Sequence, residues 1–150
     1  MLHLDALAYS QMIALAYDGL PLEACGLLGG RPGGAGSAGA VGSAGSNSAA
    51  TVTTFYPSVN AANSSKVYTI DPKTHLRAER DAEDRGAEII GVMHSHTHTD
   101  PYPSPTDIAQ APDPNWHYVI VSLRDDAPML RSFRIVDGVV HEESVAVTGR

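Results

Sequence analysis

The chain has 150 residues, the length of one ordinary domain, and 43% of them are hydrophobic and 18% charged, as is usual for a soluble globular protein. Its formal net charge is −7, which argues against DNA or RNA as the main partner, because nucleic-acid-binding proteins rely on clustered Lys and Arg. The only cysteine is Cys25, so no disulfide framework is possible. We therefore predict one soluble domain over residues 1–150.

The N-terminal region lacks a basic segment followed by an apolar run, which is the pattern of a secretory signal. No stretch approaches the roughly 20 apolar residues that a membrane-spanning helix needs. The sequence therefore predicts a cytoplasmic protein that contacts no membrane.

The first third of the chain predicts a helix, a strand and a flexible segment. Apolar residues recur on one helical face over 4–16, with Asp5 in the first turn, and Gly19 ends this helix. The apolar run 24–28 predicts a buried strand. Residues 30–50 are almost all Gly, Ala and Ser, so we expect a flexible loop that carries no chemistry.

The middle of the chain predicts two strands, a helix and a further strand. Residues 51–57 and 66–70 are rich in β-branched and aromatic side chains, which favour strands. The Asp-Pro pair at 71–72 predicts the start of a helix that runs to about residue 85. A buried strand is expected over 87–93.

The last third predicts a short helix and three strands. Ser104 is a suitable N-cap for a short helix that follows a proline-rich turn. Strands are expected over 116–123, 129–136 and 139–147, and the Asp-Gly pair at 137–138 predicts a type I′ hairpin between the last two. In order, these elements predict an α/β fold in which helices flank a mixed β-sheet.

The most informative motif is a pair of histidines one residue apart, His94 and His96, at the end of the strand predicted over 87–93. Side chains repeat every two residues along a strand, so both imidazoles point the same way. Asp107 supplies a carboxylate one short loop later. Three protein ligands with one open position are typical of a catalytic zinc site, so we predict that these three residues bind one Zn²⁺.

Two further polar residues are candidates for a hydrolytic site. Ser104 lies three residues before Asp107, so the two face the same side at the start of a helix, where the serine could donate a hydrogen bond to an oxyanion. Glu23 is the best candidate for the general base, because a charged residue beside a buried apolar run is otherwise costly. The alternative is that Glu23 is only a helix-end carboxylate.

Other residues compete for these roles. His98 extends the alternation, so His96 and His98 are an alternative metal pair. Asp100 and Asp113 are alternative carboxylates, although each suits a turn beside prolines. Cys25 is an alternative nucleophile or fourth ligand, but a lone cysteine in an apolar run is usually a small buried hydrophobe. The remaining histidines have no convergent partners and are predicted at surface or strand positions: His3, His75, His117 and His141.

Two motifs in this chain resemble the JAMM (MPN-plus) metalloprotease family. Residues 21–29, Pro-Leu-Glu-Ala-Cys-Gly-Leu-Leu-Gly, look like the opening motif of that family. His94-x-His96, followed by seven residues, Ser104, two residues and Asp107, matches the family's zinc signature. This spacing favours the pair His94 and His96 over the pair that includes His98.

The resemblance implies a cytidine-deaminase-like α/β fold over essentially the whole chain except residues 30–50. It implies zinc ligands at His94, His96 and Asp107, with Glu23 as the general base and Ser104 as the oxyanion partner. The activity it implies is hydrolysis of amide or isopeptide bonds, often after the C-terminal Gly-Gly of ubiquitin-like proteins.

A narrower resemblance is to an actinobacterial subgroup of this family. Many family members have Pro after the second histidine, whereas Thr97 stands here, and the subgroup shares this departure together with the Tyr-Pro-Ser turn at 102–104 and residues 130–138. The subgroup implies that the partner is a ubiquitin-like sulfur carrier protein, from which newly made cysteine is released. The alternatives are a broader isopeptidase that acts on ubiquitin-like conjugates and a non-catalytic MPN scaffold.

Overall fold

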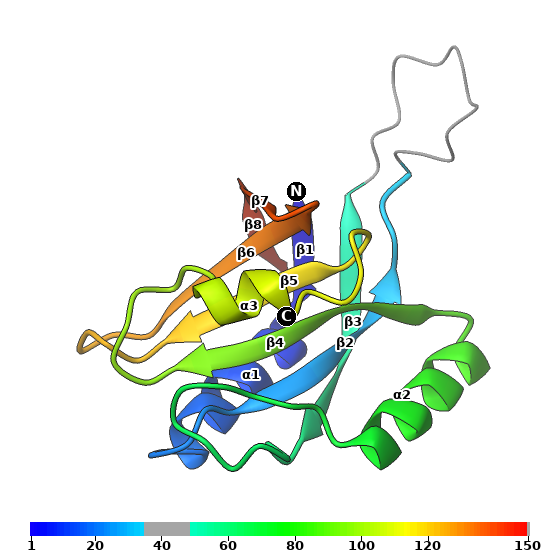
Figure 1. Ribbon diagram of the computed structural model, residues 1–150. Coiled ribbons are helices and arrows are strands. Elements are labelled where there is room, and N and C mark those ends of the chain that lie inside the picture. The colour runs from blue at the N-terminus through cyan, green and yellow to red at the C-terminus, as the bar shows by residue number, and fades with distance from the viewer. Residues whose placement is uncertain (35–48, 150) are drawn as a thin grey trace.

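The computed structural model describes residues 1–34 and 49–149 (Figure 1). Its elements in chain order are β1 (Leu2–Asp5), α1 (Ala6–Asp18), β2 (Cys25–Arg31), β3 (Ala50–Ser58), α2 (Pro72–Asp84), β4 (Glu88–His96), α3 (Pro105–Ala109), β5 (His117–Ser122), β6 (Met129–Val136), β7 (Val139–Glu143) and β8 (Val145–Thr148). Among these described helices, none is long and apolar enough to cross a membrane.

The strands form one eight-stranded mixed sheet in the order β7-β6-β5-β4-β2-β3-β1-β8, as the predicted fold class requires. Strand β1 pairs in parallel with β3 and β8, and β4 pairs in parallel with β5, whereas the other neighbours are antiparallel. Strands β7 and β8 lie at opposite ends of this order, although only Ser144 separates them in the sequence. The sheet therefore curls until its two edges approach each other, and the amide of Leu2 donates to the carbonyl of Ser144 at 2.8 Å there.

Helices cover both faces of the sheet (Figure 1). Helix α1 packs Met12 into one apolar cluster with Leu28, and α2 packs Ala78 into a second cluster with Leu27 and Val92. Leu27 and Leu28 are consecutive in β2, so their side chains point to opposite faces, and both are fully buried. A strand that is covered on both faces explains why this stretch of sequence is continuously apolar.

The N-terminal segment differs from the prediction. The helix expected from residue 4 begins at Ala6, and the residues before it form β1, with Leu2 and Leu4 fully buried. Leu4 fits the helical pattern of Leu7 and Ala8, but it also shares one face of a strand with Leu2. Pairing with β3 and β8 decides in favour of the strand. Asp5 is the N-cap rather than a first-turn residue, and its carboxylate accepts a hydrogen bond from the amide of Leu7 at 2.9 Å.

Residues 66–70, predicted as a strand, belong to no strand. Within the described chain, their one bridge joins Ile70 to Asn60. The side chain of Asn60 takes the place of a neighbouring strand, because it donates to the carbonyl of Val67 at 2.9 Å and accepts from the amide of Thr69 at 3.0 Å. Hydrogen bonds therefore tether this segment to residues 60–64.

The predicted C-terminal hairpin is present, but its second strand is shorter than predicted. Asp137 and Gly138 have φ angles of 51° and 77°, the positive values that a type I′ turn requires. The strand expected over 139–147 is split at Ser144 into β7 and β8, which pair with different partners.

The glycine-rich segment 30–50 was predicted to be a flexible loop, and positions 35–48 of it lie outside the described residues. At either end of the segment, β2 reaches Arg31 and β3 begins at Ala50, so its flanks are strands. The strand predicted at 24–28 is therefore longer than its apolar run.

Candidate metal centre and active site

Strand β4 ends in His94-Ser95-His96 and brings both imidazoles to the same side. The Nε2 atoms of His94 and His96 are 3.2 Å apart. Oδ2 of Asp107 lies 3.1 Å from Nε2 of His94 and 3.3 Å from Nε2 of His96. Donor atoms held tetrahedrally at the usual zinc distances are about 3.3 Å apart. The three donor atoms therefore have the spacing of metal ligands, and together they could hold one ion.

Hydrogen bonds and burial affect the protonation of these three groups in different ways. Nδ1 of His96 lies 2.7 Å from the carbonyl oxygen of Asp100, and when it donates there it leaves a lone pair on Nε2. Burial lowers the pKa of His94, which favours its neutral imidazole. Burial would lower the pKa of His96 as well, but its hydrogen bonds with Asp107 and with the Asp100 carbonyl raise it above its ordinary value. Burial would raise the pKa of Asp107, but hydrogen bonds with both histidines hold it well below its ordinary value. Two imidazoles and one carboxylate form the ligand set of a catalytic zinc site.

A capping box at the start of α3 fixes the carboxylate of Asp107. The amide of Asp107 donates to Oγ of Ser104 at 3.0 Å, and the amide of Ser104 donates to Oδ2 of Asp107 at 2.8 Å. The serine oxygen is the acceptor in this contact, so its hydroxyl hydrogen remains available to another group. The structure thus brings Ser104 and Asp107 together at the helix start, as predicted from their spacing.

Glu23 lies in the turn before β2 and is only 4% exposed. Two hydrogen bonds between Ala24 and Ser95 tie this turn to the end of β4: Ser95 Oγ accepts from the Ala24 amide at 2.7 Å, and the Ser95 amide donates to the Ala24 carbonyl at 2.9 Å. On the other side, the amide of Glu23 donates to the carbonyl of Ser64 at 2.9 Å. The backbone of Glu23 is therefore held beside the two histidines.

The carboxylate of Glu23 lacks the partners that a structural carboxylate would have. Its Oε1 atom is buried and has no hydrogen-bond partner among the described residues. Burial raises its pKa to about 7, an effect that the charge of His96 opposes and that of Asp107 reinforces. Such an unpaired buried carboxyl is costly to folding and is typical of a functional group. Its setting thus differs from that of a solvated helix-end carboxylate.

The competing residues lie outside this cluster. His98 and Asp100 are exposed, and the Asp100 side chain pairs with Arg124, while its backbone carbonyl contacts Nδ1 of His96. Asp113 accepts a hydrogen bond from a nearby turn amide and joins no ligand group. Cys25 is fully buried, and burial raises the pKa of its thiol to about 12, so it is not a reactive thiolate.

His117 was predicted at a surface or strand position and is a buried residue of β5. Its Nδ1 atom lies 2.5 Å from Oε2 of Glu143, which also accepts a hydrogen bond from Oγ of Ser132 at 2.8 Å. Burial would raise the pKa of Glu143, but these hydrogen bonds lower it below its ordinary value. This network joins β5, β6 and β7, and it is separate from the candidate metal ligands.

Sequence reasoning did not single out Tyr68. Its ring stacks on the imidazole of His94, with a centroid distance of 4.4 Å and an interplanar angle of 16°. Tyr68 belongs to the segment 66–70, 26 residues before His94 in the sequence. A lone tyrosine in a β-rich stretch gives no signal of such a contact, because the contact depends on how this segment crosses β4.

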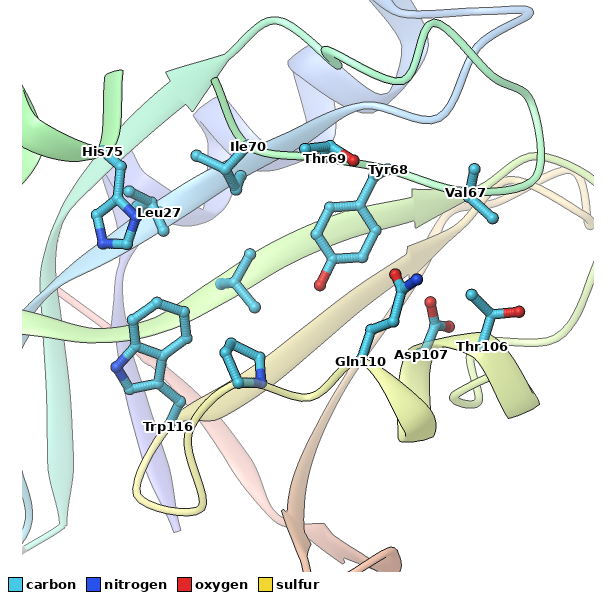
Figure 2. A pocket seen from close by; sticks show the side chains of 12 residues that line it. Leu27, Val67, Tyr68, Thr69, Ile70, His75, Thr106, Asp107, Gln110 and Trp116 are labelled. Atoms are coloured by element: carbon cyan, nitrogen blue, oxygen red, sulfur yellow. The ribbon is translucent and has the colours of Figure 1, made fainter. Parts of the chain in front are cut away.

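A cleft of about 280 Å³ begins at Asp107 and runs between the segment 67–70 and α3 (Figure 2). Leu27 and Val92 contribute apolar surface to it. Figure 2 shows Asp107 and Thr106 toward one end and Trp116 with His75 toward the other. Of the three candidate metal ligands, Asp107 alone lines this cleft, so one end of the cleft lies at the candidate metal centre.

Comparison with protein families and with solved structures agrees with this arrangement. Residues 5–136 match the family of prokaryotic homologues of the JAB domain. A protein of Desulfitobacterium hafniense has the same fold with a TM-score of 0.84 and 33% identity, covering 100% of this chain and 94% of that one. A JAB1/MPN domain protein from Archaeoglobus fulgidus, 17% identical, aligns with a TM-score of 0.55 over 99% of this chain and 100% of its own, which shows a shared fold.

Two relatives of known activity are also similar. The CysO-cysteine peptidase of Mycobacterium tuberculosis is 39% identical over 137 residues, which are 91% of this chain and 84% of that protein. The desampylase of Haloferax volcanii is 33% identical over 103 residues, 68% of this chain and 63% of that protein. The chain thus belongs to the prokaryotic JAB family and is a JAMM-type peptidase of the subgroup that includes the mycobacterial CysO-cysteine peptidases.

Proposed function

We propose that this protein is a zinc-dependent peptidase that hydrolyses the amide bond after the C-terminal Gly-Gly of a ubiquitin-like sulfur carrier protein and so releases cysteine. The observation that carries the proposal is the convergence of His94, His96 and Asp107 in the same site as the unpaired buried carboxyl of Glu23. The substrate is inferred from the 39% identity to a CysO-cysteine peptidase, which covers most of both chains.

In this proposal His94, His96 and Asp107 hold the zinc ion. When bound, zinc supplies a Lewis acid and lowers the pKa of water at the open coordination position. Glu23 takes a proton from the water that adds to the scissile carbonyl and returns it to the amine of the departing cysteine as the C–N bond breaks. Ser104 donates its free hydroxyl hydrogen to the oxyanion.

The cleft suits the extended tail of such a carrier. Asn60 occupies one side of the segment 67–70, whereas the backbone amide and carbonyl of Tyr68 have no hydrogen-bond partner among the described residues. A peptide in the cleft can pair with these groups by strand addition, with its end directed at Asp107. Two glycines at that end carry no side chains to collide with the walls near the metal ligands.

A second candidate is a broader isopeptidase that removes ubiquitin-like proteins from lysines. The similarity to the desampylase of Haloferax volcanii favours it. A third, a non-catalytic scaffold, would not need an unpaired carboxylate buried in the ligand site, and all five predicted site positions are filled with reactive side chains here.

The test uses the purified zinc-loaded protein and two substrates built on one carrier, one ending in Gly-Gly-Cys and one joined through Gly-Gly to a lysine side chain. We expect mass spectrometry to show faster release of cysteine than of lysine, and a chelator to stop both reactions. Faster cleavage at lysine would support the isopeptidase function instead. If the protein takes up no zinc and cleaves neither substrate, the scaffold function would be supported.

Glu23→Gln isolates the general base, because the amide has the same shape and cannot take a proton. We expect this variant to retain zinc, as measured by elemental analysis, while kcat falls by about 10²- to 10⁴-fold. Unchanged turnover in Glu23→Gln would refute the role of Glu23.

A further inference from the structure

The two candidate histidine ligands are held in different ways. Nδ1 of His96 has a partner, the carbonyl oxygen of Asp100 at 2.7 Å. The loop that carries this carbonyl is anchored to the end of β5, because Oγ of Ser122 donates to the carbonyl of Thr99 at 2.5 Å and the amide of Leu123 donates to the carbonyl of His96 at 3.0 Å. The plane of the His96 imidazole is thus fixed by a hydrogen bond to an anchored loop.

His94 has no such hydrogen bond. Its Nδ1 atom is buried and has no hydrogen-bond partner in the part of the chain that the structure describes. Histidines that bind metals almost always donate their second ring N–H to a carboxylate, a carbonyl or water, which fixes the orientation of the ring. No protein group among the described residues fixes the His94 ring through Nδ1.

The ring of Tyr68 covers one face of the His94 imidazole. The two planes differ by 16° and the centroids are 4.4 Å apart, which is the geometry of a stacked pair. His96 meets the same imidazole edge-on, with a centroid distance of 5.0 Å and an angle of 60°. Rotation of the His94 ring would drive its atoms into the tyrosine face.

Tyr68 is itself held in place, because Asn60 fixes the backbone on both sides of it through Val67 and Thr69. The same Asn60 amide group donates to the carbonyl of Glu23 at 3.1 Å. One side chain therefore sets both the position of the stacking ring and the position of the candidate base relative to the site.

We propose that Tyr68 is a positioning residue, whose ring fixes the imidazole plane of His94 by stacking in place of the hydrogen bond that His94 lacks. The proposal rests on the zinc site proposed above. It requires the aromatic face of Tyr68 and not its hydroxyl group, so phenylalanine must serve equally well as a support for His94.

The test measures zinc affinity by competition with a chromophoric chelator, together with the melting temperature of the metal-free protein. We expect Tyr68→Phe to bind zinc within about 2-fold of the wild type and Tyr68→Leu to bind about 10-fold or more weakly, the usual effect of removing a group that orients a ligand. The control is Val67→Ala, which removes a neighbouring side chain of the cleft that is not stacked on His94. Its zinc affinity should equal that of the wild type.

Wild-type affinity in Tyr68→Leu would overturn the proposal, as would equal losses in Tyr68→Phe and Tyr68→Leu. If Tyr68→Leu does not fold, Tyr68→Met preserves more side-chain volume and takes its place in the comparison. A wild-type protein that binds no zinc would instead refute the function proposed above, so the two failures are distinguishable.

Discussion

Ala24 and Ser95 exchange two hydrogen bonds, one to the serine hydroxyl at 2.7 Å and one between their backbones at 2.9 Å, although they are 71 positions apart in the sequence. Glu23 precedes the first of these residues, and Ser95 lies between the two histidines of β4. Side chains that alternate along a strand send Ser95 away from the imidazoles, to the side where it reaches the turn before β2. This contact joins the two separate motifs of the sequence into one site.

Ser95→Ala removes the acceptor for the buried amide of Ala24. We expect the free energy of unfolding in urea to fall by about 1–3 kcal/mol, because a buried N–H group loses its partner. We also expect kcat/KM to fall by about 10- to 100-fold, because Glu23 is no longer held in register with the histidines. Ser10→Ala, at an exposed position of α1, is the control and should change neither quantity appreciably.

Ser104 has two roles, as the N-cap of α3 and as the proposed oxyanion donor. Ser104→Ala loses both, so we expect a loss of about 1 kcal/mol in stability and a fall in kcat of about 100-fold or more. Ser104→Thr keeps a hydroxyl group for both roles and should recover most of the activity. Steady-state kinetics with the carrier–cysteine substrate measure the change in kcat. Full activity in Ser104→Ala would refute the role of Ser104 as the oxyanion donor.

His94→Ala and His98→Ala distinguish the two possible histidine pairs. His94 is buried in the ligand group, whereas His98 is exposed and outside it. Elemental analysis should therefore find zinc lost from His94→Ala and retained by His98→Ala. The opposite pattern would show that His96 and His98 are the histidine ligands.

Glu143 should make the stability of the fold depend on pH. The pKa of Glu143 is lowered in the folded chain, so its carboxylate contributes to the free energy of unfolding in full above its ordinary pKa of 4.5. This stabilisation is lost as the pH falls through the pKa that Glu143 has in the folded chain. Glu143→Gln removes the charge that His117 and Ser132 solvate. We expect it to reduce the free energy of unfolding by about 2 kcal/mol at pH 7 and by clearly less at pH 3.

The control for this measurement is Glu142→Gln, on the same strand. Glu142 pairs with Arg131 at 3.4 Å, but both side chains are about half exposed, at 50% and 48%. An exposed ion pair of this kind contributes little to stability, so the free energy of unfolding of Glu142→Gln should lie within about 0.5 kcal/mol of the wild-type value at both pH values. A loss as large as that of Glu143→Gln would show that the buried network has no special effect.

Local patterns predicted most of the elements that carry the site. The Asp-Pro pair at 71–72 does cap α2, the Asp-Gly turn at 137–138 does form the hairpin, and the capping box of Ser104 and Asp107 follows from spacing alone. Each of these signals is complete within a few residues, so tertiary structure does not need to supply anything further.

The errors occur where distant strands decide the outcome. Leu2 and Leu4 form a strand only because β3 and β8 pair with it, and residues 66–70 fail to form one because an asparagine side chain occupies the position of a partner strand. The stacking of Tyr68 on His94 was missed for the same reason. The spacing of the motif indicated the three candidate ligands and the cap beside Asp107, but nothing in the sequence indicated what orients the two imidazoles.

The antiparallel register of β2 and β4 sets Cys25 opposite His94. Glu23 precedes Cys25, so the proposed base comes beside the histidines only when these two strands, distant in the sequence, have paired. Such non-local pairing has to overcome the entropy cost of closing the intervening chain. In the proposed function, hydrolysis therefore requires the folded sheet, and a chain in which β2 and β4 are separated should have no activity.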